Sequence, residues 1–180
     1  MNMRLYYTLF LMLFASSVMC QQWTLNKDKS EINFKIRNAG SNVNGAFKSF
    51  SGKLDMEGDD IEAGKISGEI QVASIETGVK RRDRHLLEEE YFYEEEFPVI
   101  TFKSKEISKT DSNTLEIQGQ LTIREITKQV AFQVDYAQQT RVQVFIFELP
   151  LNRRDFEVGG NSWLLADELT AIITLAFTKS

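Results

Sequence analysis

Apolar and polar side chains alternate with a period of two over most of the chain, and this pattern constrains the fold more than any other feature. The runs that show it are residues 32–36, 66–72, 115–123, 130–136, 145–151 and 171–177. Such alternation is typical of half-buried antiparallel strands, which have one face on the core and the other in water. The pattern therefore predicts an all-β fold.

Short polar links separate neighbouring runs, so hairpins are expected to dominate the topology. Gly68 and Gly119, both in mid-strand, fit the sharp bends of a barrel wall. These features favour a closed antiparallel barrel of about eight strands, with a two-sheet sandwich as the alternative. The turn-forming residues between the runs lie at 26–30, 57–60, 109–113 and 124–127.

Two segments interrupt the alternation. Residues 81–90 are predicted to form a short helix, and residues 154–167 an irregular loop. The phase also slips by one residue between Val144 and Phe145, where a β-bulge would restore it. No change in composition divides the remaining chain, so residues 21–180 are expected to form one barrel domain.

The N-terminal residues 1–20 have the organisation of a secretory signal peptide, with Arg4 ahead of an apolar run at 5–14 and small residues after it. That run is about half the roughly 20 residues that a membrane-spanning helix needs. We therefore expect an exported protein that is not an integral membrane protein. Removal of the signal would also remove Cys20, the single cysteine, so no disulfide is expected. Met19, directly before Cys20, disfavours a lipid anchor there.

The charge and the reactive side chains argue against several functions. The net charge of −5 does not fit nucleic-acid binding, which needs clustered lysine and arginine. His85 is the single histidine, so a zinc site is a poor prospect, and no G-x-S-x-G motif is present. A half-buried imidazole with a structural hydrogen bond is the favoured interpretation of His85. We therefore predict no catalytic residue, no metal ligand and no cofactor.

The segment 82–98 combines aromatic residues with two glutamate triplets. Leu86, Phe92 and Phe97 are expected to form its apolar side. We predict that the segment covers the open end of the barrel as a plug or lid. The glutamate triplets are typical of a solvated face, which would dock a basic partner if the domain is an interaction module.

Phenylalanine is abundant, with thirteen among 180 residues, and many occupy inward strand positions. A filled core is the default interpretation for a small barrel, although an eight-stranded barrel can also hold one small ligand. Each buried CH₂ group contributes about 0.8 kcal/mol, so a long hydrocarbon would bind favourably in such an interior. The residues alone leave both interpretations open.

A series of motifs follows one another between residues 23 and 177. The quoted segments are "WTLNKDKSEINFKI", "VNGAFKSFSGKL", "SIETGVKRRDRHL", "YFYEEEFPVITFKS", "GQLTIREITKQV" and "NRRDFEVG". In this order and spacing they resemble the YceI-like family of exported proteins. The third segment is similar to the family's T…RDxHL signature, through Thr77, Arg82, Asp83, His85 and Leu86. The last is similar to its RxDFG stretch, with Glu157 in place of the glycine, and Glu125 replaces a glycine in the hairpin before it.

The resemblance implies an extended, lipocalin-like antiparallel β-barrel with an isoprenoid lipid, an isoprenoid quinone or a similar amphiphile in a central tunnel. It also implies a periplasmic location in a bacterium and no catalytic residues. Arg82 and His85 are then the expected contacts of the ligand's polar end. Exposed strand edges leave a homodimer open. The side chains expected to line the tunnel are Phe34, Ile36, Phe47, Phe50, Ile70, Val72, Leu86, Phe92, Phe102, Leu121, Phe132, Val134, Phe145, Phe147, Phe156 and Trp163.

Overall fold

The fold, seen in a computed structural model that describes residues 20–179, is all-β with one short α-helix, as predicted. The predicted signal peptide lies outside the described residues except for Cys20. The strands are β1 (Cys20–Leu25), β2 (Glu31–Asn38), β3 (Ser41–Phe47), β4 (Phe50–Glu57), β5 (Asp60–Gln71), β6 (Ile75–Glu76), β7 (Val99–Lys109), β8 (Thr114–Ile123), β9 (Ile126–Gln138), β10 (Val142–Asn152) and β11 (Leu165–Lys179). The helix is α1 (Lys80–Leu86), and 3₁₀ turns lie at η1 (Lys27–Lys29), η2 (Val72–Ser74) and η3 (Arg153–Phe156).

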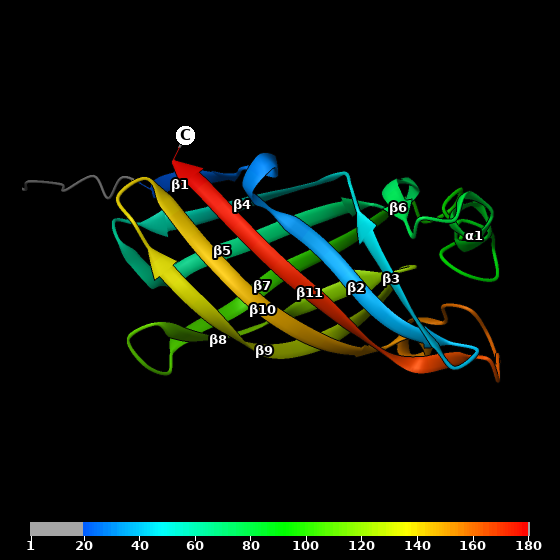
Figure 1. Ribbon diagram of the computed structural model, residues 1–180. Coiled ribbons are helices and arrows are strands. Elements are labelled where there is room, and N and C mark those ends of the chain that lie inside the picture. Colours follow the sequence, from blue (N-terminus) through cyan, green and yellow to red (C-terminus); the bar gives the residue numbers. More distant parts are fainter. Residues whose placement is uncertain (1–19, 180) are drawn as a thin grey trace, which may run out of the picture.

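Eight strands close into an antiparallel barrel in the order β1-β4-β5-β7-β8-β9-β10-β11, and pairing between β1 and β11 completes the circle (Figure 1). The predicted barrel of about eight strands is confirmed, and the sandwich is excluded. Short hairpins join four of the eight neighbouring pairs in the circle, namely β4–β5, β7–β8, β8–β9 and β9–β10, because the chain alternates there between strands and polar turns.

The remaining strands lengthen one end of the barrel. β11 pairs with β1 only near Lys179, whereas β2 pairs with the earlier part of β11, from Leu165 to Thr174. β3 and β6 then continue the sheet from β2. This added wall lies toward the end of the barrel that carries α1 and the loop before β11, and the C-terminus lies at the opposite end (Figure 1).

The bulge predicted between Val144 and Phe145 is absent, and the pairing of β10 with β11 is continuous there. The phase never slips, because Gln143 takes the inward position that the hydrophobicity pattern left empty. Its side chain is buried, and its Oε1 accepts a hydrogen bond of 2.5 Å from the hydroxyl of Tyr136. A buried amide with a partner is compatible with the core, so Val144 points outward on a regular strand. The register shifts lie elsewhere, for example between Ser104 and Glu106 in β7.

Burial and the nearby carboxylate of Asp59 raise the pKa of Tyr136 to about 12. The unfolded chain releases this proton near pH 10 and the folded protein near pH 12, so the folded state holds an extra proton between these values. The contribution to stability is fully present below pH 10 and falls by about 1.4 kcal/mol per pH unit as the pH rises toward 12.

We expect Tyr136→Phe to be less stable than the wild type at neutral pH, by about 1–3 kcal/mol, because the Gln143 side-chain carbonyl loses its hydrogen-bond donor. Urea unfolding across this range should show the difference shrinking, and a constant difference would contradict the prediction.

The predicted turns and irregular segments are confirmed with shorter bounds. The helix occupies Lys80–Leu86 rather than 81–90, and hydrogen-bonded turns follow it. The hairpin between β8 and β9 turns through Arg124 and Glu125, whose φ angles are +52° and +64°. Glutamate therefore adopts the left-handed conformation at the position where the family pattern has glycine, at some cost in strain.

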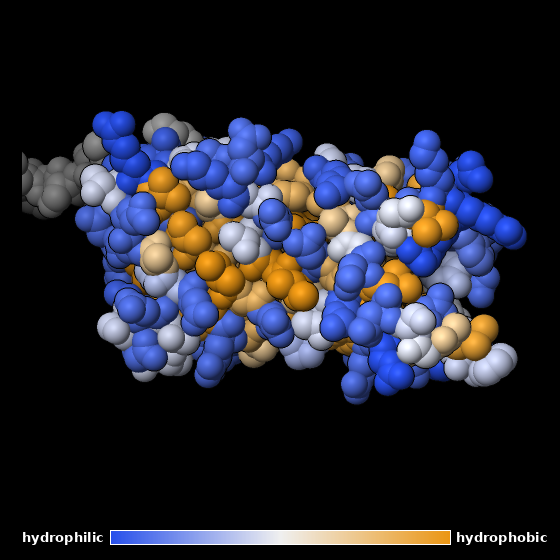
Figure 2. Space-filling model, in the orientation of Figure 1, coloured by the Kyte–Doolittle hydropathy of each residue, from blue (hydrophilic) through white to orange (hydrophobic). Residues whose placement is uncertain are grey.

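Two hydrophobic clusters pack inside the barrel at different heights. The first surrounds Trp23, Leu54 and Met56, near the end where β1 closes the barrel. The second surrounds Phe47 and Phe156 at the α1 end. On the outside, Figure 2 shows apolar side chains running diagonally over β10 and β11, where Ile146 and Ile172 are among the exposed residues.

Candidate ligand-binding site

A cavity of about 550 Å³ occupies the α1 end of the barrel. Its walls come from β2, β3, β10 and β11, from residues of β5 to β8 and η3, and from α1 and the segment after it. Because its lining includes the exposed residues Val79, Arg81 and Leu164, the cavity opens at this end. The volume lies within the roughly 300–1,000 Å³ of small-molecule sites. Apolar side chains that line it are Ile32, Phe34, Ile36, Val43, Phe47, Ile70, Ile75, Leu86, Phe92, Ile100, Leu121, Ile123, Leu149, Leu151, Phe156, Val158, Leu165, Leu169, Ala171 and Ile173.

A second cavity, of about 110 Å³, continues the hollow toward the middle of the barrel. Residues that line both cavities are Ile32, Ile70, Ile100, Leu121, Leu149 and Ile173. These shared side chains are the boundary between the two. The rings around the smaller space include Phe132 and Phe147, stacked with centroids 4.5 Å apart, and Phe102, 5.8 Å from Phe132. Both cavities are thus lined mainly by apolar side chains, and the inner one is the smaller of the two.

Most of the predicted lining residues face these cavities. The large cavity receives Phe34, Ile36, Phe47, Ile70, Leu86, Phe92, Leu121 and Phe156, and the small one receives Phe102, Phe132, Phe145 and Phe147. The remaining predicted residues lie elsewhere. Phe50, Val72 and Val134 are buried members of the two hydrophobic clusters and line neither cavity. Trp163 is 91% exposed, because it lies in the loop before β11, where no strand pairing directs its side chain inward.

Two glycines make room for aromatic rings in the walls. A Cβ atom at Gly45 would lie 2.2 Å from the ring of Phe34, so this ring packs directly on the backbone of β3. A Cβ at Gly119 would lie 2.5 Å from the ring of Phe102. Both rings thus lie close to the sheet rather than across the hollow. Gly119 was expected to mark a bend, and its contact with Phe102 is the close packing that the structure adds.

The segment after α1 covers one side of the large cavity, as the predicted lid would. Leu86 and Phe92 pack against the second cluster, and the ring of Phe92 meets that of Phe47 edge-on at 6.0 Å. Phe97 differs from the prediction. Its ring packs edge-on against Tyr93 at 5.7 Å and does not line either cavity.

A cluster of polar side chains at the start of α1 holds this helix in place at the opening of the large cavity, which we call the mouth. The carboxylate of Asp83 accepts hydrogen bonds from the backbone N–H and the hydroxyl of Thr77, at 2.8 and 2.5 Å. Arg82 donates from Nε to the Thr77 hydroxyl and from Nη2 to the Thr77 carbonyl, at 2.7 and 2.8 Å. Arg82 and Thr77 also line the cavity. Arg82 was expected to contact a ligand, and the Nη1 group is the part of its guanidinium that these bonds leave for that contact.

His85 lies at the rim of the cavity, with half of its side chain exposed. Its Nε2 is 3.7 Å from Glu88 and 3.9 Å from Glu90, and its ring packs edge-on against Tyr91 at 4.8 Å. These contacts, rather than the predicted structural hydrogen bond, position the imidazole. Tyr91 also lines the cavity, and burial and, next, the charge of Glu90 raise the pKa of its phenol above the usual value of 10.0.

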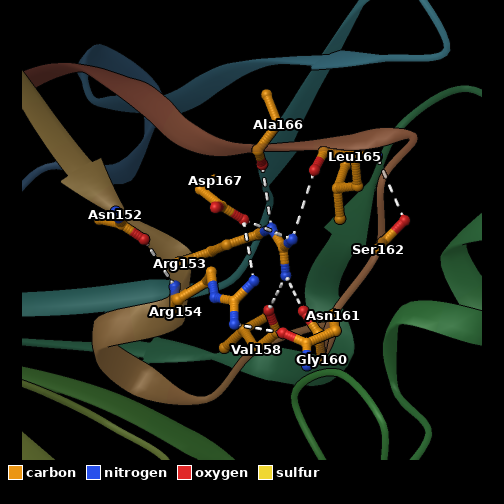
Figure 3. Close-up of polar contacts among 10 residues, drawn as sticks. All are labelled: Asn152, Arg153, Arg154, Val158, Gly160, Asn161, Ser162, Leu165, Ala166 and Asp167. Carbon is orange, nitrogen blue, oxygen red and sulfur yellow. Dashed lines mark hydrogen bonds and ion pairs between the residues drawn. The ribbon is translucent and has the colours of Figure 1, made fainter.

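Arg153, which was not among the predicted lining residues, supports the opposite side of the cavity opening. Its side chain is 2% exposed, and each guanidinium N–H direction has an acceptor (Figure 3). Nε donates to the Ala166 carbonyl at 2.9 Å, and Nη1 donates to the carbonyls of Val158 and Gly160 at 2.7 and 3.0 Å. Nη2 donates to the Leu165 carbonyl at 3.3 Å and to Asp167 at 2.7 Å.

The position of Arg153 carries a signal in the sequence. It continues the inward series of Leu149 and Leu151 on β10 with the same spacing of two. An arginine at an inward position must find buried acceptors, and the loop that follows supplies them. With its hydrogen bonds satisfied by the protein, Arg153 holds the loop and is not available to a ligand.

No group of three or more histidine, cysteine, aspartate or glutamate side chains within residues 20–179 could hold a metal ion. Within the same range, no helix is long and apolar enough to cross a membrane.

Comparison with known proteins decides the family. A family model described as the YceI-like domain matches residues 23–177. The chain belongs to the YceI-like family. A UPF0312 protein of Ectopseudomonas mendocina is 31% identical over 121 residues, which cover 66% of this chain and 63% of that relative. A UPF0312 protein of Pseudomonas putida is 27% identical over 128 residues, which cover 69% of this chain and 67% of the relative.

Solved structures share the fold of this YceI-like domain. BcnA of Burkholderia cenocepacia superimposes with a TM-score of 0.79 at 28% identity, over 84% of this chain and 98% of that one. The YCEI protein of Campylobacter jejuni gives 0.70 at 26% identity, over 78% and 87%. A polyisoprenoid binding domain of Saccharophagus degradans, implicated in plant cell wall breakdown, gives 0.73 at 12% identity, over 88% and 98%. At that identity the last match bears on the fold alone.

Proposed function

We propose that this YceI-like domain binds a long apolar amphiphile, of the isoprenoid lipid or isoprenoid quinone class, in its barrel. The observation that carries the proposal is the apolar cavity of about 550 Å³, continued by the smaller one beyond Leu121. A narrow apolar hollow suits a chain molecule, and each CH₂ group that leaves water contributes about 0.8 kcal/mol. The Saccharophagus degradans domain of the same fold, a polyisoprenoid binding domain, adds support.

The polar end of the ligand would lie at the mouth. The hydrogen-bond donors available there are Nη1 of Arg82 and the protonated hydroxyl of Tyr91, and His85 also lines the cavity. Such groups suit a quinone carbonyl or a phosphate, which accept hydrogen bonds. Arg153 does not contact the ligand but holds the loop before β11 at the cavity opening through its hydrogen bonds to backbone carbonyls.

The proposal includes no catalysis. The single histidine meets glutamates and a tyrosine ring rather than a nucleophile. Binding alone accounts for the residues at the mouth. Export through the signal peptide and a location in a bacterial periplasm form part of the proposal, and a homodimer stays a prediction that sedimentation velocity tests.

Native mass spectrometry of the purified protein tests the proposal. After incubation with an isoprenoid quinone or a polyprenyl phosphate, we expect one ligand per chain. A straight-chain alcohol of equal length serves as a comparison for selectivity. The alternative is an interaction module with a filled barrel and a partner at the glutamate-rich segment. A protein that stays free of ligand with every probe would favour this alternative over the proposed ligand binding.

A further inference from the structure

The apolar lining of the large cavity continues onto the outer surface. Trp163 is 91% exposed, Val79 48% and Leu164 44%. Val79 and Leu164 also line the cavity, so the same side chains form both its rim and its wall. Exposure of a tryptophan ring to water is unfavourable because of its large apolar area. A cluster of exposed apolar side chains commonly marks a surface that binds a partner.

The loop holds Trp163 outward rather than leaving it loose. Before it, the hydroxyl of Ser162 accepts a hydrogen bond from the backbone N–H of Leu165, at 3.2 Å. After it, the carbonyl of Leu164 accepts one from the N–H of Ala39, at 2.8 Å, which ties the loop to the β2–β3 hairpin. Arg153 holds the Leu165 carbonyl as well. Because both flanks of Trp163 are fixed, its exposure is a property of the folded loop.

Positive charge lies beside this rim although the chain as a whole is acidic. Lys80, Arg81 and Arg84 are exposed on α1, directly after Val79. The segment directly after α1 adds the glutamates of residues 88–90 and 94–96 at the same end of the barrel, and Glu88 and Glu90 approach the ring of His85. Tryptophan with neighbouring cationic side chains is the combination found at the headgroup level of bilayers.

We propose that the α1 end of the barrel docks on a lipid bilayer, with Trp163, Leu164 and Val79 entering the headgroup region and the cations of α1 meeting lipid phosphates. The inference rests on the proposed function, because a carrier that docks mouth-down transfers its ligand without exposing it to water. In Figure 1, α1 and the loop before β11 lie at the same end of the barrel, as this orientation requires.

The two tryptophans make a direct test. Trp23 is 1% exposed in the core and gives a constant signal, whereas Trp163 reports on its surroundings. We expect vesicles of phosphatidylethanolamine and phosphatidylglycerol, free of isoprenoids, to shift the emission to the blue and to protect it from iodide. An emission spectrum and an iodide sensitivity that do not change with vesicles would overturn the proposal.

Variants separate docking from ligand binding. We expect Trp163→Ser to weaken cosedimentation with the vesicles by about tenfold, and Trp163→Phe to retain most of it. Ile146→Ser removes a side chain of equal exposure to Val79 from the barrel wall, and it should bind vesicles as the wild type does. Equal losses in Trp163→Ser and Ile146→Ser would refute the assigned orientation. Since the vesicles carry no isoprenoid, a failure here leaves the mass-spectrometric result standing, and a failure of that result leaves the docking result standing.

Discussion

Replacing Arg153 with methionine is expected to lower the free energy of unfolding by about 3–5 kcal/mol. The guanidinium donates to the carbonyls of Val158, Gly160, Leu165 and Ala166. Methionine fills similar space but donates nothing, so carbonyls around a buried side chain lose their partner. The loop before β11 should then loosen, because Arg153 binds four of the backbone carbonyls in and beside it.

The adjacent arginine provides a matched control. Arg154 is 45% exposed, lies 3.8 Å from Asp167 and donates to Asn161. Exposed pairs of this kind contribute little, so Arg154→Met should cost less than about 1 kcal/mol. Arg153→Lys keeps the charge but not the planar set of donors, and it should recover only a small part of the loss. Chemical denaturation gives the free energies, and proteolysis within residues 157–165 reports the loop. Equal stability of Arg153→Met and Arg154→Met would disprove the role of Arg153.

The barrel itself could be predicted because the period of two is a local property of each strand. On β10, every second residue from Gln143 to Leu151 points inward, and the neighbouring strands behave likewise. The error arose where hydrophobicity and orientation disagree. Gln143 is polar and inward, so its strand was assigned a bulge that does not exist. Its partner, Tyr136, lies on the next strand, and no local pattern announces that hydrogen bond.

The position of the hollow could not be read from the alternation. Phe132 and Val134 are both inward on β9 and are two residues apart, yet Phe132 lines the small cavity whereas Val134 is fully packed. The side chains that pack against each of them come from strands far away in the sequence, such as Phe102 of β7 against Phe132. The added strands at the α1 end widen the wall there. The cavity is therefore a consequence of how the strands are arranged, and the sequence of a single strand does not predict it.

The motifs at the mouth raise a related point. Thr77, Arg82 and Asp83 were identified by resemblance, but their main interactions are with one another. A motif residue that shapes the site cannot be told from one that touches the ligand until its hydrogen bonds are known. In this domain, the donors left for a ligand come from only part of Arg82 and from side chains such as Tyr91, which the motif does not include.

Ala171 offers the sharpest test of whether the hollow holds the ligand. Its methyl group faces the large cavity from β11, opposite Phe34 on β2 and Leu149 on β10. We expect Ala171→Trp to place the indole in this space and to weaken ligand binding by about a hundredfold. Displacing only four buried CH₂ groups of the ligand would cost about 3 kcal/mol, which corresponds to that factor. The fold should survive with a cost of at most about 1–3 kcal/mol, because the ring enters an existing cavity.

The next residue on the strand is the control. Ile172 points away from the barrel and is 40% exposed, so Ile172→Trp enlarges a side chain on the same strand without entering the hollow. It should bind an isoprenoid quinone as the wild type does, as judged by titration of the quinone and by thermal unfolding of each protein. If Ala171→Trp folds and still binds with wild-type affinity, the ligand does not occupy the large cavity. If both variants lose binding equally, the loss does not come from filling the hollow, and the site lies elsewhere on the barrel.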